Sequence, residues 1–175
     1  MIDEIFACPV RKYNIDDNRI KSWAPGKYDE EKFEQPSPFQ RQITEMDGFM
    51  MPLYVDVFEQ FVNEIGLGKT HVGIVTNIIL SGLEKGEYLC KHNTLPSHYT
   101  ATHFVEGSSP DVYHHPDQTV MNILAPPIDE WNTSVSLYTN EGDLIIHPSY
   151  LEYSTPRVDK RRVTLTFLLN LQERE

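Results

Sequence analysis

Residues 142–153, Gly-Asp-Leu-Ile-Ile-His-Pro-Ser-Tyr-Leu-Glu-Tyr, form the most informative stretch of this 175-residue sequence. The run from Asp143 to His147 is dominated by aliphatic residues that favour β-structure. Turn-forming residues at 140–143 (Asn-Glu-Gly-Asp) precede it, and Pro148, which cannot donate a backbone hydrogen bond, follows it. The pattern predicts a short strand that is bounded by a turn on one side and a bend on the other.

Similar short runs occur on both sides of this strand. They are rich in Val, Ile, Thr, Leu and aromatic residues, and Pro, Gly, Asn and Ser separate them. Several short strands at fairly even spacing indicate an antiparallel sandwich, barrel or jelly roll rather than alternating β-α-β units. The predicted strands cover residues 4–10, 71–80, 99–105, 119–124, 134–138 and 162–171.

One helix is predicted ahead of most of these strands. In residues 54–66 apolar side chains recur every three or four positions, and Gly66 and Gly68 fit a helix end. Residues 11–50 show neither period and contain turn pairs such as Pro25-Gly26. We therefore expect one structural domain, with an extended N-terminal arm over residues 1–53 that packs on the core or on a neighbouring subunit. A helix plus jelly-roll domain is expected over residues 54–175.

The composition excludes several classes of function. The formal net charge is −11, whereas binding to nucleic acid or to anionic lipid needs a clustered positive field. Cys8 and Cys90 form no CxxC pair, which argues against a structural zinc site or a disulfide scaffold. The first residues lack the pattern of a signal peptide, and no apolar stretch approaches the roughly 20 residues that cross a bilayer. We expect a soluble protein that binds neither nucleic acid nor membrane.

His115 and Asp117, in the middle of the chain, are candidate metal ligands. They are two positions apart, so both side chains would point to one side of an extended chain. A His-x-Asp pair is half of a two-histidine, one-carboxylate iron site, which leaves coordination positions open for substrate and oxygen. The alternative is a polar loop that caps a helix or strand, and the pair alone does not distinguish the two.

Arg162 and Thr164 are candidate ligand-binding residues on the last predicted strand. They share one face of that strand. A fixed guanidinium beside a hydroxyl suits a carboxylate, because the planar fork donates two charge-assisted hydrogen bonds. The alternative is a surface salt bridge with one of the 26 acidic residues, which would contribute little to stability.

The order of these segments resembles a family of small bacterial and viral 2-oxoglutarate/iron(II)-dependent oxygenases. The matching segments are IFACPV at 5–10, YHHP at 113–116, GDLIIHPSYLEY at 142–153 and RVTLTF at 162–167, and the last two are the most specific. The resemblance spans most of the chain. It implies a double-stranded β-helix (jelly-roll) fold and iron(II) and 2-oxoglutarate as cofactors. It also implies that Arg162 binds the distal carboxylate of 2-oxoglutarate, with Thr164 in place of the family's serine.

The sequence departs from the family at two of the three expected metal ligands. Tyr113 replaces the first histidine and Tyr153 replaces the distal histidine, while His115 matches the second ligand. His147 precedes Tyr153 by six residues, about 20 Å in an extended strand, so it could substitute only if the chain folds back at Pro148. The other candidates, which could approach from a neighbouring strand, are His98 and His103.

Three functions are compatible with these residues. The first is a degenerate oxygenase fold that serves as a structural or binding subunit, with protein partners or as a homo-oligomer, in the cytoplasm or within an assembled, viral particle. The second is an active hydroxylase that binds iron through His115, Asp117 and one further ligand. The third is a cupin-like binder of a sugar or another small molecule without metal. The loss of two ligands favours the first.

Overall fold

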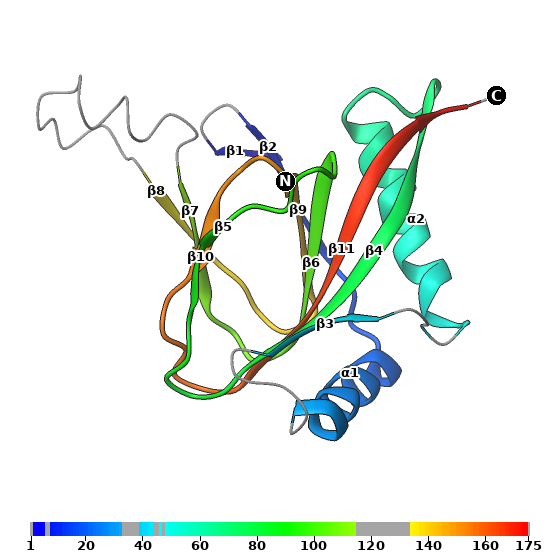
Figure 1. Ribbon diagram of the computed structural model, residues 1–175. Helices are drawn as coiled ribbons and strands as arrows, with labels where there is room; N and C mark the ends of the chain where they lie inside the picture. Colours follow the sequence, from blue (N-terminus) through cyan, green and yellow to red (C-terminus); the bar gives the residue numbers. More distant parts are fainter. Residues whose placement is uncertain are drawn as a thin grey trace, which may run out of the picture.

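The computed structural model describes residues 2–5, 8–32, 39–43, 46, 48–114 and 134–174. In this part of the chain two antiparallel sheets face each other, and both helices lie on the outer side of the larger sheet (Figure 1). This arrangement confirms the predicted mainly β, antiparallel jelly-roll architecture. No helix in the described ranges is long and apolar enough to cross a membrane.

The larger sheet has seven strands in the order β1-β2-β9-β6-β11-β4-β3. Strands that are distant in sequence are therefore neighbours, and the long C-terminal strand β11 lies between β4 and β6. The bounds are β1 Ile2–Ile5, β2 Cys8–Asn14, β3 Phe39–Ile43, β4 His71–Leu83, β6 Tyr99–Glu106, β9 Asp143–Pro148 and β11 Arg162–Glu173.

The smaller sheet has four strands in the order β5-β10-β7-β8. Its strands are short, and β5 and β8 form its two edges. The bounds are β5 Leu89–His92, β7 Pro110–His114, β8 Ser134–Tyr138 and β10 Tyr153–Thr155. Of these strands only β8 was predicted from the sequence. The predicted strand at 119–124 lies outside the described residues.

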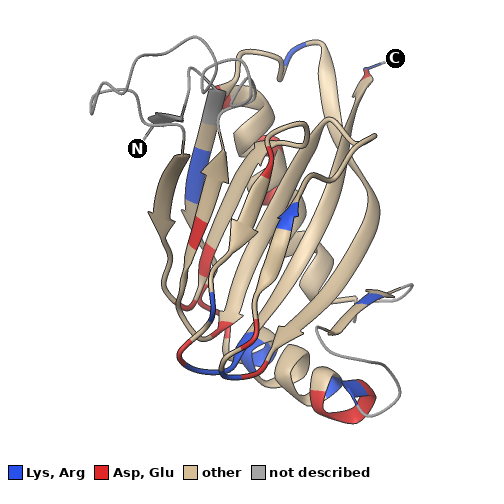
Figure 2. Cartoon of the chain, turned by 60° about the vertical axis from the view of Figure 1, so that its left-hand side comes forward, with Lys and Arg blue, Asp and Glu red and all other residues tan. Residues whose placement is uncertain are grey.

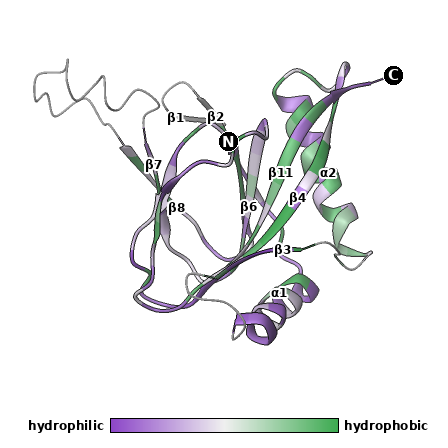
Figure 3. Cartoon of the chain, viewed as in Figure 1, coloured by the Kyte–Doolittle hydropathy of each residue, from purple (hydrophilic) through white to green (hydrophobic). Residues whose placement is uncertain are grey.

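Alternation along the first half of β11 gives this strand an apolar face and a polar face. Val163, Leu165 and Phe167 belong to the large core between the seven-stranded sheet and the helices. Arg162 and Thr164 point the other way, into the space between the two sheets, because successive strand residues face opposite sides. In Figure 3 hydrophobic colouring runs along β4, β11 and α2, whereas the loops below the smaller sheet are hydrophilic.

Helix α2 (Met50–Glu64) confirms the helix predicted at 54–66, although it begins four residues earlier. Pro52 is accommodated in its first turn, where a backbone N–H has no partner within the helix. Tyr54, Phe58 and Phe61 are buried on the face that packs on the sheet. Gly66 has a φ of +82°, the left-handed conformation that ends a helix and that glycine adopts without steric conflict.

The expectation of an extended arm over residues 1–53 is wrong in its local structure. Strand β2 pairs with β9 inside the larger sheet, and residues Asn18–Glu31 form helix α1. Pro25 and Gly26 lie within this helix rather than in a turn. Tertiary packing overrides their poor helix propensity, because Ile20, Ala24 and Tyr28 recur every four residues and are all buried.

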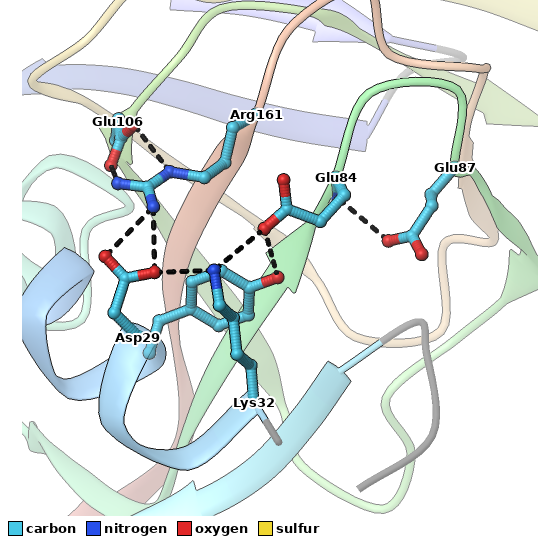
Figure 4. A network of polar contacts seen from close by, with 7 residues as sticks. Asp29, Lys32, Glu84, Glu87, Glu106 and Arg161 are labelled. Carbon is cyan, nitrogen blue, oxygen red and sulfur yellow. Dashed lines mark hydrogen bonds and ion pairs between the residues drawn. The ribbon is translucent and has the colours of Figure 1, made fainter.

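A network of ion pairs fastens helix α1 to the end of the sheet (Figure 4). The Arg161 guanidinium donates to both oxygens of Glu106, at 2.8 and 2.6 Å, and to both oxygens of Asp29 on the helix, at 2.9 and 3.0 Å. Lys32 at the helix end pairs with Asp29 at 2.8 Å and with Glu84 at 3.4 Å. Figure 2 shows charged residues of both signs gathered at this end of the molecule. The network gives α1 a fixed position although its sequence predicts no helix.

Candidate functional site

The strands that enclose the space between the two sheets carry polar side chains inward. On β11 these are Arg162, Thr164 and Thr166, and Thr102 on the neighbouring strand β6 lies 3.4 Å from Thr166, hydroxyl to hydroxyl. All four side chains are buried. A buried polar lining is unusual for a protein core, in which polar groups need hydrogen-bond partners. It therefore marks this interior as the candidate site.

Tyr113 and Tyr153 lie side by side on neighbouring strands of the smaller sheet. They are register partners on the antiparallel strands β7 and β10, and their ring centroids are 5.8 Å apart. Both rings are buried. The fold therefore brings together the two tyrosines at which the resemblance implies metal-binding histidines.

His147 completes this cluster because the chain does fold back after β9. A turn in which the Leu151 N–H donates to the Pro148 carbonyl at 3.1 Å reverses the chain. As a result, the imidazole centroid of His147 lies 5.1 Å from the Tyr113 ring and 5.1 Å from the Tyr153 ring, with T-shaped geometry in both contacts. The condition that the sequence set for His147, a chain that folds back at Pro148 instead of continuing about 20 Å in an extended strand, is therefore met.

The protonation of His147 follows from its surroundings. Nδ1 lies 3.0 Å from the Pro148 carbonyl, which can only accept, so Nδ1 carries the proton. Complete burial lowers the pKa of this histidine to about 4, so the ring is neutral at pH 7. Nε2 is then a bare acceptor, and it is buried without a hydrogen-bond partner among the described residues. His147 thus has the tautomer that a metal-binding imidazole needs.

Burial shifts the pKa values of the two phenols, Tyr113 and Tyr153, upward, whereas it shifts the pKa of His147 downward. Burial raises the pKa of Tyr113 and of Tyr153 well above the ordinary value, and the negative charge of Asp111 raises both further. Arg162 acts against this shift at both tyrosines without reversing it. At neutral pH both side chains therefore remain protonated, and a neutral phenol is a weak metal ligand.

Arg162 is already bound to a carboxylate that belongs to the protein. Its two terminal nitrogens donate to the two oxygens of Asp111 on β7, at 2.7 and 3.0 Å. The two side chains are 4% and 2% exposed. Sequence reasoning identified Arg162 but missed Asp111, which lies only two residues before Tyr113 and could have been found from that spacing. Thr164 is buried on the same face of β11.

The remaining predicted ligands divide into two groups. His115 and Asp117 lie outside the described residues. His103 faces the helices instead of the site, because its Nδ1 accepts from the Tyr54 hydroxyl at 2.6 Å and its Nε2 donates to the Ile15 carbonyl at 3.1 Å. His98 is exposed, and its Nδ1 accepts from the Leu171 amide at 2.9 Å. Neither His98 nor His103 joins the cluster.

The described residues do not fit iron(II) and 2-oxoglutarate in the arrangement that the resemblance implies. That arrangement needs two imidazoles and a carboxylate on one metal and a free guanidinium for the co-substrate. Here two protonated phenols and one imidazole meet, and the guanidinium of Arg162 is saturated by Asp111. Within the described ranges, no group of three His, Cys, Asp or Glu side chains is placed to hold a metal ion.

Comparison with solved structures identifies the fold. The chain is similar to a prolyl-4-hydroxylase from Pseudomonas putida, with a TM-score of 0.58 and 11% identity over 92% of this chain and 91% of that one. It is also similar to the viral collagen prolyl hydroxylase vCPH from Paramecium Bursaria Chlorella virus-1, with a TM-score of 0.60 and 9% identity over 91% and 94% of the two chains. A third similar structure is AviO1 from Streptomyces viridochromogenes Tue57, with a TM-score of 0.62 and 8% identity over 92% and 89%.

The sequence itself gives no such match. No family model matches the chain. A search of curated proteins likewise finds no match. Identities of 8 to 11% mean that the three-dimensional arrangement, not the sequence, carries the similarity. The chain has the double-stranded β-helix fold of the 2-oxoglutarate/iron(II) oxygenases.

Proposed function

We propose that this chain uses an oxygenase fold without the 2-oxoglutarate and iron(II) reaction, as a binding or structural subunit of a larger assembly. The observation that carries the proposal is the buried cluster of Tyr113, Tyr153 and His147, whose rings pack where the resemblance implies two metal-binding histidines. Phenols that stay protonated and pack against each other fill space and exclude water, and they do not provide charge for a cation.

The packing of the two tyrosines on β7 and β10 gives a physical reason for a structural role. Tyr113 and Tyr153 each add a large buried ring to a sheet of only four short strands. Together with Phe104, Ile145 and Leu151 they form a second, smaller hydrophobic cluster. Burying an aromatic side chain contributes roughly 2 to 3 kcal/mol. The substitution of ligands by tyrosines thus converts a metal site into packing that holds the smaller sheet on the larger one.

Anaerobic iron(II) loading tests this proposal. We expect no stoichiometric iron in the wild-type protein, and stoichiometric iron when Tyr113→His and Tyr153→His are combined, because three imidazoles would then meet at His147. The measurement is metal content by mass spectrometry after gel filtration, with iron(II) affinity by competition. The matched control changes two exposed tyrosines, Tyr88→His and Tyr138→His, which are 48% and 74% exposed and should add no iron.

Two results would contradict the proposal. Stoichiometric iron in the wild type that binds more tightly with 2-oxoglutarate would establish a metal centre with an unexpected ligand set. Iron that binds equally to the double variant and to the control pair would show that Tyr113 and Tyr153 do not occupy ligand positions.

An active hydroxylase is the second candidate, and one observation favours it. His147 presents an unprotonated, buried Nε2 to the interior, while its Nδ1–H is held by a backbone carbonyl as in metal-binding histidines. With iron(II) and 2-oxoglutarate bound, such a centre would supply oxygen activation. His115, Asp117 and His147 would then be the ligands to test. Succinate formation from 2-oxoglutarate by the iron-loaded wild type, lost in His147→Ala, would replace the first proposal with this one.

A further inference from the structure

The guanidinium of Arg162 lies in a site that is built to hold a carboxylate. Its fork meets the two oxygens of Asp111 at 2.7 and 3.0 Å, the side-on geometry of a bidentate pair. The same pair is almost fully buried. An isolated charge at this depth would carry a large desolvation penalty, so each of the two ions depends on the other.

Neutral groups complete the site around both ions. The Ser109 hydroxyl accepts from Arg162 at 2.8 Å, and the Thr155 hydroxyl donates to Asp111 at 2.7 Å. The Phe104 ring lies under the guanidinium, with the guanidinium carbon 4.6 Å from the ring centroid. A carboxylate in this position therefore receives three hydrogen bonds from a rigid setting, which is what a small anionic ligand would need.

The carboxylate of Asp111 also lies within electrostatic range of the aromatic cluster. Its charge raises the pKa of both Tyr113 and Tyr153, and it acts on His147 as well. The Arg162 site and the aromatic cluster therefore lie near each other in the space between the two sheets.

We infer that Asp111 is a tethered ligand: the interior contains a carboxylate-binding site that the chain fills with its own side chain. Free carboxylates are excluded because a side chain fixed on β7 has a far higher effective concentration than a dissolved ligand. Removing the Asp111 carboxylate should open the site to formate, acetate or 2-oxoglutarate, with Arg162 as the anchor. This inference does not depend on whether metal binds near Tyr113, so its test and the iron test can fail separately.

Chemical rescue tests the inference. Thermal unfolding of wild type and Asp111→Ala is followed in sodium formate, acetate or 2-oxoglutarate, with sodium chloride at equal ionic strength as reference. A ligand that binds only the folded state raises the unfolding temperature, because it stabilises that state by RT ln(1 + [L]/Kd). We expect each carboxylate to bind Asp111→Ala at least tenfold more tightly than wild type, and this gain to disappear in Asp111→Ala/Arg162→Met.

A matched control is available in the same fold. Asp143 is also buried and pairs with Lys12 at 2.5 Å, but that lysine side chain is 35% exposed and is a point charge rather than a fork. Asp143→Ala should therefore show no specific rescue by carboxylates. Rescue of both variants alike would indicate a general salt effect and would overturn the inference.

Two further outcomes would also overturn it. Wild-type protein that binds acetate or 2-oxoglutarate as tightly as Asp111→Ala would show that Asp111 does not occupy the site. A folded Asp111→Ala that gains nothing from any carboxylate would show that the pair is only structural. If Asp111→Ala fails to fold in chloride, its refolding yield in acetate is measured instead, and the absence of any increase contradicts the inference.

Discussion

His103 shows how a buried histidine can be fully satisfied and have no part in the site. Tyr54 donates to its Nδ1 and Nε2 donates to the Ile15 carbonyl, so the imidazole links α2, β6 and the segment before α1. Burial lowers the pKa of His103 from the ordinary 6.5 to about 4. The residue is therefore neutral when folded, and this has a consequence for stability that can be measured.

The free energy of unfolding should fall as the pH decreases from about 6.5 to about 4. In this window the unfolded chain binds a proton at His103 and the folded chain does not, so protons favour unfolding. Above pH 6.5 neither state binds the proton and the contribution is complete. His103 alone contributes a loss on the order of 3 kcal/mol at most, since one pKa unit corresponds to about 1.4 kcal/mol. His147, whose pKa burial also lowers to about 4, adds its own loss in the same window.

Urea unfolding at pH 7, 5.5 and 4.5 measures this effect. His103→Gln should lower stability at pH 7 and flatten the dependence on pH, whereas His98→Gln, at an exposed position, should leave the slope unchanged. An unchanged slope in His103→Gln would assign the dependence to other groups.

At the scale of single residues, the sequence named several members of the candidate site but not how they pair. Arg162, Tyr113 and Tyr153 were found because they align with motifs. Asp111 was missed, and His147 was named only on the condition of a bend at Pro148, because their roles depend on contacts from β7 to β11 and around that bend. Register between strands and the path of a turn are set by tertiary packing, which a local pattern does not contain.

At the scale of elements, helix α1 depends on a close approach to the sheet. Gly82 on β4 lies directly against Tyr28 of this helix: a Cβ at position 82 would be 2.1 Å from the Tyr28 ring. The ring is also held by Phe39, with centroids 5.3 Å apart. The helix can therefore reach its position only because residue 82 has no side chain.

Two glycine substitutions should act in opposite directions. Gly82→Ala should destabilise the protein by about 1 to 3 kcal/mol, because the added methyl displaces a buried ring. Gly26→Ala, inside α1 with nothing within 4 Å of the new Cβ, should stabilise by about 0.5 to 1 kcal/mol through helix propensity. Chemical denaturation measures both, and hydrogen exchange of the α1 amides should increase in Gly82→Ala only. Equal effects of the two variants would contradict this packing.

The elements that sequence patterns predicted correctly are a helix with a periodic apolar face and strands with runs of β-favouring residues bounded by turn residues. These are α2 and the strands β4, β6, β8, β9 and β11. Helix α1 was missed because its buried residues Ile20, Ala24 and Tyr28 are few and Pro25 lies among them. The short strands β5 and β10 were missed because three or four residues are too few to show a period.

At the scale of the whole molecule, we propose that the smaller sheet provides the surface for assembly. Among the described residues, its edge strands β5 and β8 each pair with one strand only, so their outer backbone groups have no strand partner there. Exposed aromatic side chains accompany both edges: Tyr88 is 48% exposed beside β5, and Tyr138 is 74% exposed on β8. A pocket of 630 Å³ beside β5, lined by Tyr88, Leu89 and His92 among others, adds a concave feature to that edge.

Sedimentation velocity tests self-association through these edges. We expect the sedimentation coefficient to rise across a hundredfold range of protein concentration, and Tyr138→Glu to shift the protein toward the monomer by adding charge to an edge strand. Leu95→Glu, at a position 59% exposed and outside the strands, is the control and should change nothing. A monomer throughout the concentration range would rule out a homo-oligomer.

The buried pair of Arg162 and Asp111 also constrains how this protein can evolve. Losing either charge alone leaves the other one orphaned at a buried position, which is strongly destabilising. A lineage that has acquired Asp111 can return to an open Arg162 only through an intermediate that folds poorly. Single substitutions at either position are therefore disfavoured, and positions 111 and 162 should change together or not at all among this protein's descendants.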